Sequence, residues 1–242
     1  ERYLSDAATI TTTSKRLQSI ISPYREILWT PNGFEQETFF PVPRSGDLKI
    51  GWSGNQNDRF KGLYDILLPA VGNDFELKIA GGNLDHGSMR DFYNSIDVLC
   101  VASLAEGEPL TLIEGMACGC FPVCVDVGIV PELVTHIKNG LIINRNVGAF
   151  RAAFQWCKLN LEYIREAALQ NVTLIQHERT WDKTSYYWRE MFRNASSCLF
   201  TPNTKLISGT NGSQISEHNE IKENIFNIPS VISNMPAEKE IN

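Results

Sequence analysis

The stretch "DVLCVASLAEGEPLTLIEGMACGCFPVCVDV", residues 97–127, contains one complete strand–helix–strand unit. The apolar run at 97–103 predicts a buried strand, the segment 109–119 has helical character, and the apolar run at 121–127 predicts the next strand. The loop between the first strand and the helix carries two acidic side chains in "LAEGE". Parallel strands joined by a covering helix produce this pattern, so it predicts an α/β fold.

The same alternation continues on both sides of this unit. We expect further strands at 8–12, 26–30, 48–54, 76–82 and 141–144, and further helices at about 13–22, 60–71, 88–96, 146–159, 161–177 and 181–195. Most of the strands are apolar throughout, as strands buried on both faces are. Residues 48–144 therefore predict a Rossmann-like parallel sheet with helices on both faces, which should bind its ligands beyond the carboxyl ends of the strands.

Composition limits the classes of function that remain open. The chain has 242 residues, of which 43% are hydrophobic, and a net charge of −6 with a pI near 5.3. This acidic balance argues against nucleic acid or an anionic membrane surface as a general partner. No apolar run approaches the roughly 20 residues that a membrane span needs. The N-terminus lacks both an initiator Met and a signal peptide, so we expect the chain to be a piece of a longer protein.

Six cysteines stand mostly within apolar runs, which favours buried, reduced thiols and a cytoplasmic location. A metal site at "CGCFPVC", residues 118–124, is the alternative, but no second pair of Cys or His stands at zinc-finger spacing. Residues 198–242 have scattered prolines, many Ser and Asn and no sustained period. They predict a disordered tail or a linker.

The loop 103–108 and the helix after it have the chemistry of an anion and sugar site. Pro109 suits the first helical position, and the N–H groups of Leu110, Thr111 and Leu112 should lack helical partners, so they can bind a phosphate. Gly107 lets the backbone approach a ligand. Two carboxylates flank this anion site: Glu106 can accept hydrogen bonds from one pair of neighbouring hydroxyls, and Glu114 from another. A sugar, a diphosphate and a ribose in series fit that order.

These residues resemble the signature of the family 4 glycosyltransferases. The segments "EGEPLTLIEGMACGCFPV" (106–123) and "DVGIVPELVTHIKNGLII" (126–143) are similar to the family patterns E-G-[FTL]-[GP]-x-x-x-x-E-A-M-A-x-G-x-P-V-V, G-G-x-x-E-[LI]-V and N-G-x-L-[VF]. Weaker similarity extends over about 6–195, through "PNGFEQETFFP" (31–41), "IGWSGNQNDRFKG" (50–62), "KIAGG" (78–82), "FYNSIDVLCVAS" (92–103) and "RTWDKTSYYWREMF" (179–192). The family consists of retaining transferases with the two-domain GT-B fold.

The resemblance implies roles for individual residues. Glu106 would bind hydroxyls of the transferred sugar, Glu114 would bind the ribose hydroxyls, and the N–H groups of Leu110 and Thr111 would hold the diphosphate. Lys61 matches the family's Lys, which neutralises the departing diphosphate. The donor-binding set that we expect consists of Gly54, Glu106, Gly107, Glu108, Pro109, Leu110, Thr111 and Glu114.

Two departures from the family pattern affect these expectations. Trp52 stands where the family has a catalytic Arg, so Arg59 is the candidate for the second cation, and the backbone of 51–54 is the alternative phosphate contact. The loop after "KIAGG" is shorter than in most relatives. It leaves Asn83, His86 and Met89 as candidates for the nucleobase pocket.

The resemblance also implies the domain organisation and the partners. Residues 1–45 would be the end of an acceptor-binding domain with its linker, 46–178 the nucleotide-sugar-binding domain, and 179–197 a helix that crosses back to the acceptor domain. The partners would be a nucleoside-diphosphate sugar, an acceptor that is a glycan, a lipid or a small molecule, and the missing N-terminal domain, through which the protein could associate peripherally with a membrane. No cofactor or metal is expected, because the sequence contains no D-x-D pair.

Three functions are alternatives to glycosyl transfer. A nicotinamide dehydrogenase is rejected, because neither "GWSGNQND" nor "AGGNLDHG" has the spacing G-x-G-x-x-G. A nucleotide-sugar-binding module without transferase activity stays open, as does a sugar-nucleotide epimerase of the same fold. We expect the parent protein to be a glycosyltransferase and the isolated chain to bind donor with little or no turnover.

Overall fold

A parallel five-stranded sheet forms the centre of the molecule. The structure is a computed structural model, which describes residues 7–82 and 84–200, with only the backbone at 197–200. The strands are β3 (Ile50–Gly54), β4 (Leu77–Gly81), β5 (Val98–Val101), β6 (Phe121–Cys124) and β7 (Leu141–Ile142), in the order β4-β3-β5-β6-β7. Each lies within a range predicted from the sequence. The expected tail falls almost wholly outside the described residues, and so does Asn83.

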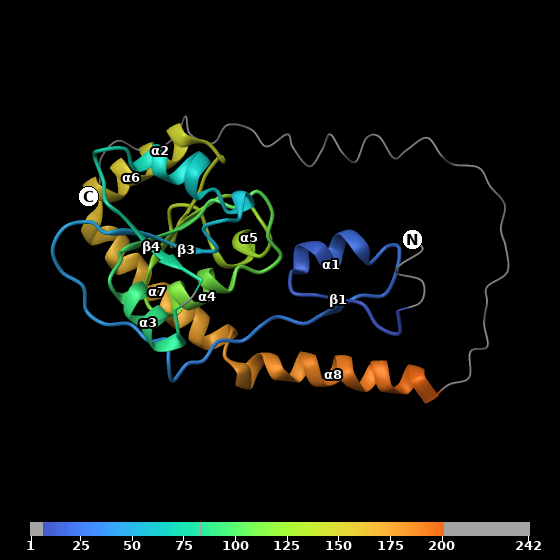
Figure 1. Cartoon of the computed structure of the whole chain (residues 1–242). Coiled ribbons are helices and arrows are strands. Elements are labelled where there is room, and N and C mark those ends of the chain that lie inside the picture. Colours follow the sequence, from blue (N-terminus) through green and yellow to red (C-terminus); the bar gives the residue numbers. More distant parts are fainter. Residues whose placement is uncertain (1–6, 83, 201–242) are drawn as a thin grey trace, which may run out of the picture.

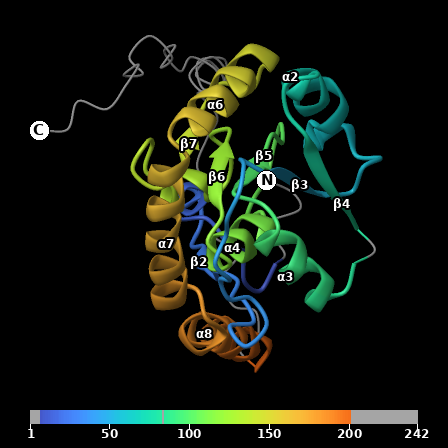
Figure 2. The ribbon, with the colours of Figure 1, turned by 90° about the vertical axis from the view of Figure 1, so that its left-hand side faces the viewer.

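Helices cover both faces of the sheet, as predicted (Figure 2). Consecutive residues of β5 point to opposite faces: Val98 packs in one core cluster and Leu99 in the other. The first cluster is closed by η2 (Leu63–Leu67), α2 (Leu68–Val71) and α6 (Val147–Leu159), and the second by α3 (His86–Asn94), α4 (Leu110–Ala117) and α5 (Val130–Leu133); α7 (Leu161–Glu178) contributes to both. The four-residue helix α5 is not among the helices predicted from the sequence.

The strand order places a topological switch point between β3 and β5. After β3 the chain forms β4 on one side of it, and then returns to form β5 on the other side. The connections therefore run in opposite directions from β3 and β5, and the loops at their carboxyl ends separate. In open parallel sheets this switch point is where ligands bind.

The segment 60–71 differs from the single helix that the sequence predicted. It consists of the 3₁₀ turn η1 (Arg59–Lys61), then Gly62, then the π-helical turn η2, and finally α2. Gly62 has φ of +77°, which ends the first turn and starts the next. Pro109 also differs from the expectation: it is the N-cap of α4, and the helix begins one residue later, at Leu110.

The N-terminal residues form a small separate layer. Strands β1 (Thr11–Thr12) and β2 (Leu28–Trp29) pair in parallel and are connected through α1 (Lys15–Ile21). Figure 1 shows α8 (Trp181–Phe200) leaving the sheet domain and running beneath this layer. Trp188 Nε1 donates to the Pro31 carbonyl at 2.9 Å, and Trp29 packs edge-on against Tyr187 with ring centroids 4.8 Å apart. The layer thus contacts the sheet domain partly through α8.

Candidate functional site

The loops on the two sides of the switch point bring Lys61 and Glu106 into contact. Lys61 Nζ forms an ion pair with Glu106 Oε1, and Ser103 Oγ donates to the same oxygen at 2.7 Å. The Lys61 side chain is 31% exposed and that of Glu106 is 14% exposed. Two oppositely charged groups, 45 positions apart in the sequence, thus meet at a contact that is partly exposed to solvent.

Gly62 explains how Lys61 reaches this position. A Cβ atom on Gly62 would lie 2.4 Å from the carbonyl oxygen of Ala102, and its φ of +77° is a conformation that only glycine adopts without strain. The 59–62 turn can therefore pack directly on the end of β5, beside Ser103. The Leu104 N–H donates to the Phe60 carbonyl at 2.7 Å and joins the two loops.

The start of α4 provides backbone donors beside this pair. Pro109, with φ −66° and ψ 104°, leads into the helix and has no N–H of its own. Within the described residues, no hydrogen bond is found from the N–H groups of Leu110 or Thr111. The Leu112 N–H, which we had expected to be unpaired, donates to the Pro109 carbonyl at 2.9 Å and is not available. Two amides at the positive end of the α4 dipole remain for an anion.

Glu114 lies on α4 and is oriented by a buried tyrosine. Tyr93 has 0% exposure, and its hydroxyl donates to Glu114 Oε2 at 2.8 Å. Burial raises the pKa of the Glu114 carboxyl, and the hydrogen bond from Tyr93 and the nearby His86 each lower it. Ser53, at the end of β3, lies 3.5 Å from the same tyrosine hydroxyl. One oxygen of this carboxylate is bound by Tyr93, which leaves Oε1 for a ligand.

Both oxygens of the Glu108 side chain have partners within the protein. This side chain is only 1% exposed and forms an ion pair with Arg179, with Oε1 3.0 Å from Nη1. Its other oxygen accepts hydrogen bonds from the Asn32 backbone N–H at 3.0 Å and from Asn32 Nδ2 at 2.7 Å. The donor-binding role expected for Glu108 stays a prediction.

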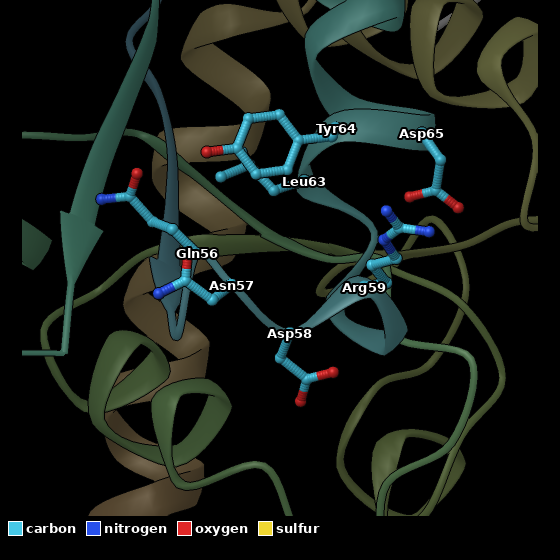
Figure 3. Close-up of a pocket in the computed structure, with 7 residues that line it drawn as sticks. All are labelled: Gln56, Asn57, Asp58, Arg59, Leu63, Tyr64 and Asp65. Carbon is cyan, nitrogen blue, oxygen red and sulfur yellow. The ribbon is translucent and has the colours of Figure 1, made fainter.

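Trp52 and Arg59 occupy different surroundings. Trp52 is 2% exposed and belongs to the core, where its indole would be 3.0 Å from a Cβ on Gly54. Among the described residues, the Arg59 side chain forms no hydrogen bond or ion pair with Lys61 or Glu106. It lines a cavity of about 600 Å³ together with Tyr64 and Asp65. Figure 3 shows Arg59 across this cavity from Gln56. The cationic role of Arg59 stays a prediction.

The described part of the chain contains no group of three or more His, Cys, Asp or Glu side chains that could hold a metal ion. Its cysteines at 100, 118, 120, 124 and 157 are buried free thiols, as predicted, and burial raises the pKa of the Cys120 thiol to about 12. Within the same residues, no helix is both long enough and apolar enough to span a membrane.

Several residues of this site were not found by sequence reasoning. Tyr93 stands in the quoted segment 92–103 and Arg179 in 179–192, but neither was given a role. Ser103 was treated only as the end of a strand. A hydroxyl or guanidinium that supports a carboxylate through a tertiary contact has no spacing rule in the sequence, because the two groups come from different elements.

Comparison with known proteins finds one family model that matches the middle of the chain. Residues 75–168 match the family model "Glycosyl transferases group 1", and they include Tyr93, Glu106 and Glu114. No curated protein sequence matches the chain.

Solved structures share its fold. Sucrose-phosphate synthase from Thermosynechococcus elongatus aligns with 18% identity and a TM-score of 0.70, covering 81% of this chain and 60% of that one. HepE from Anabaena, in complex with UDP and glucose, aligns with 13% identity and a TM-score of 0.62, covering 79% and 63%. The C-terminal domain of a group 1 family glycosyl transferase from Francisella tularensis has 14% identity, a TM-score of 0.52 and coverage of 60% and 98%.

These likenesses confirm the predicted α/β fold, which is that of the C-terminal half of GT-B glycosyltransferases. The chain spans 60% of the length of the sucrose-phosphate synthase chain and 63% of the HepE chain.

Proposed function

Because residues 75–168 are a group 1 glycosyl transferase region, we propose that this chain is the donor-binding half of a glycosyltransferase. The enzyme moves a sugar from a nucleoside-diphosphate sugar to an acceptor hydroxyl. The observation that carries this proposal is the meeting of Lys61 and Glu106 at the switch point of the sheet, beside the start of α4. A diphosphate at Lys61 and α4 places the attached sugar within reach of Glu106.

Each group has a chemical role in this proposal. Lys61 and the N–H groups of Leu110 and Thr111 stabilise the negative charge that develops on the departing diphosphate. Glu106 accepts hydrogen bonds from sugar hydroxyls, and Glu114 Oε1 accepts them from the ribose. We propose that the positive charge comes from these protein groups and the α4 dipole without a metal ion, so that a chelator leaves donor affinity unchanged.

The reaction that we propose retains the configuration at the anomeric carbon. The bond between that carbon and the diphosphate oxygen breaks through an oxocarbenium-like state, and the acceptor oxygen forms its bond on the same face. The acceptor proton passes to the departing diphosphate. This path needs no basic side chain on the opposite face of the sugar, and the proposal assigns the two carboxylates, Glu106 and Glu114, to the sugar and ribose hydroxyls instead.

The proposal extends to the donor, the acceptor and the cellular location. HepE was solved with UDP and glucose, and TarM of S. aureus with UDP and α-GlcNAc-glycerol. We propose a uridine, guanosine or adenosine diphosphate sugar as donor and a glycan, lipid or small-molecule hydroxyl as acceptor. The buried free thiols suit a reducing cytoplasm.

Calorimetric titration with UDP, GDP and ADP, in the presence of EDTA, tests the proposal. One diphosphate should bind to the chain, and Glu114→Ala should weaken it at least tenfold, by about 1.4 kcal/mol or more. Glu162→Ala, which removes an exposed carboxylate from α7, is the matched control and should bind as the unaltered chain does. No binding of any diphosphate, or equal loss in both variants, would contradict the proposal.

A second candidate function is binding of the nucleotide sugar without transfer. It is favoured by Trp52, a buried side chain at the position where the family resemblance implies a cation. A third is epimerisation of the sugar nucleotide. Incubation of each donor with the chain, followed by analysis of the sugar, separates the three: transfer consumes donor only with acceptor present, epimerisation changes the sugar without acceptor, and binding changes nothing.

A further inference from the structure

A buried ion pair outside the proposed donor contacts joins the donor loop to distant parts of the chain. The Glu108 and Arg179 side chains are 1% and 3% exposed, with Oε1 and NH1 3.0 Å apart. Glu108 Oε2 accepts two hydrogen bonds from Asn32. Removing two charges from water is costly unless their remaining hydrogen-bonding capacity is satisfied, and here both carboxylate oxygens are bound.

The partners of Glu108 come from two segments that lie beside each other. Arg179 separates α7 from α8, and its carbonyl accepts the Phe34 N–H at 2.9 Å. Phe34 and Thr180 form a parallel bridge. The Arg179 guanidinium also lies over the Trp29 ring, 5.5 Å from its centroid. Glu108 is therefore attached to a rigid corner that 29–34 forms with 179–180.

The attachment acts on the backbone that holds the proposed phosphate site. Glu108 directly precedes Pro109 and Leu110, and the other side of the loop is fixed where the Ile129 N–H donates to the Gly107 carbonyl at 3.1 Å. A Cβ on Gly128 would lie 2.1 Å from that same carbonyl oxygen, so the contact is close. The loop is thus held at two adjacent residues, by the ion pair at Glu108 and by packing at Gly107.

We propose that Glu108 is a positioning residue, whose ion pair with Arg179 fixes the backbone of 107–111 in the geometry that binds a diphosphate. This inference rests on the proposed function. It assigns the carboxylate a task that involves no contact with the donor: preorganised amides bind an anion more tightly than amides that must be ordered on binding.

The test compares Glu108→Gln with a matched control in the full chain. Asp97→Asn is that control, because the Asp97 side chain is 2% exposed and forms another ion pair, 2.8 Å from Arg165 Nε, at the opposite end of β5. The probes are the nucleoside diphosphate that binds best and its nucleoside without phosphates. Amide hydrogen exchange is followed in parallel at Leu104, Leu112 and Ile129, whose N–H groups donate to the Phe60, Pro109 and Gly107 carbonyls and are therefore protected while the loop is held.

Glu108→Gln should weaken diphosphate binding at least tenfold, change nucleoside binding less than twofold, and speed exchange of these three amides at least tenfold. Asp97→Asn should lower the melting temperature and leave the ratio of the two affinities and the exchange of these amides unchanged. An unchanged ratio together with unchanged exchange in Glu108→Gln overturns the proposal. If Glu108→Gln does not fold, Asn32→Ala replaces it, since it removes only the Nδ2 bond, and it should shift the ratio about threefold in the same direction.

Failure of the proposed function gives a different result. If the unaltered chain binds no nucleoside diphosphate, the proposed function is wrong. Hydrogen exchange alone then tests whether Glu108 fixes the loop. Faster exchange of Leu104, Leu112 and Ile129 in Glu108→Gln but not in Asp97→Asn then supports the fixed loop, and equal exchange in both overturns it.

Discussion

At the scale of single residues, the hydrogen bond from the Tyr93 hydroxyl to Glu114 should affect how donor affinity depends on pH. Burial raises the pKa of Glu114 above its ordinary value of 4.5, and the Tyr93 hydrogen bond and His86 lower it. Only the ionised carboxylate accepts hydrogen bonds from both ribose hydroxyls, so donor affinity should fall as the pH falls through this pKa. Tyr93→Phe removes one lowering contribution, and the pKa of Glu114 then rises.

The expected result for Tyr93→Phe is that the loss of nucleotide affinity on acidification begins at a higher pH than in the unaltered chain. Calorimetric titrations between pH 5 and 8 measure it. Tyr163→Phe is the control, because that hydroxyl donates to the Ile137 carbonyl at 3.1 Å, on a different part of the chain. Superimposable pH profiles for Tyr93→Phe and the unaltered chain would refute the orienting role of the tyrosine hydroxyl.

Gly62 can be tested against a second glycine with a similar backbone. Gly62→Ala should cost about 2–4 kcal/mol of unfolding free energy, because it combines left-handed strain with a Cβ 2.4 Å from a carbonyl oxygen. Gly46 has φ of +82° and nothing within 4 Å of its Cβ position, so Gly46→Ala should cost only about 1 kcal/mol. Urea unfolding measures both, and equal losses would contradict the close packing on Ala102.

The sequence predicted candidate residues for the site, but not the groups that their side chains contact. Lys61 and Glu106 were proposed separately, for phosphate and for sugar, and the structure shows that they contact each other. Glu108 was expected to bind the donor because it lies in the same loop, but its side chain turns toward Arg179. Sequence position fixes where a side chain starts, whereas its direction depends on charges that the fold brings near.

At the scale of elements, helix α4 has one end available to a ligand and the other end closed by the protein. Arg44 NH1 donates to the Gly119 carbonyl at 2.6 Å, and NH2 donates to the Cys118 and Tyr93 carbonyls at 2.7 and 3.0 Å. A cation at a helix C-terminus satisfies the last carbonyls and the dipole together.

Arg44→Met should therefore destabilise the chain by about 2–4 kcal/mol, since three carbonyls lose a charged donor. Arg151→Met serves for comparison, because the Arg151 side chain is 43% exposed, its Nη2 donates to only one carbonyl, that of Pro69, at 2.7 Å, and its ion pair with Asp74 is long, at 3.9 Å; its loss should stay below about 1 kcal/mol. Denaturant unfolding compares the two. Losses of the same size would mean that α4 does not depend on this cap.

The periodicity of apolar residues predicted which segments are helices and which are strands. It did not predict where a helix is interrupted or where it begins. The apolar pattern at 60–71 is that of a helix, yet Gly62 divides the segment because the turn must approach Ala102. Pro109 was expected inside the helix and lies just before it, because a proline is compatible with both the cap and the first turn. These differences depend on tertiary packing, which a window of sequence does not contain.

At the scale of the whole molecule, strand order creates the site. The sequence predicted every strand of the sheet but not that β3 would lie between β4 and β5. That order alone brings the 54–62 loop to the 102–109 loop. It could not be read from the strands themselves, since apolar strands buried on both faces carry no pairing code.

The N-terminal layer is attached to the sheet domain by fewer contacts than the sheet has within itself, and this predicts how the molecule opens. Strands β1 and β2 have two residues each, and α1 has no buried residue. Glu132 Oε1 holds the start of α1 by accepting from Ser14 Oγ at 2.8 Å and from the Arg16 N–H at 3.1 Å. Regions with little buried apolar surface open locally before the core does.

Glu132→Ala should consequently speed amide exchange in residues 10–21, by a factor that corresponds to about 1–3 kcal/mol, while exchange in β5 and β6 stays as it was. Glu26→Ala removes an exposed carboxylate from the same layer and should change neither rate. Uniform acceleration across the layer and the sheet would show one cooperative unit instead. In that case, losing the Ser14–Glu132 contact would also destabilise the sheet and its donor site. Opening of the N-terminal layer would then loosen the loop that holds Glu106.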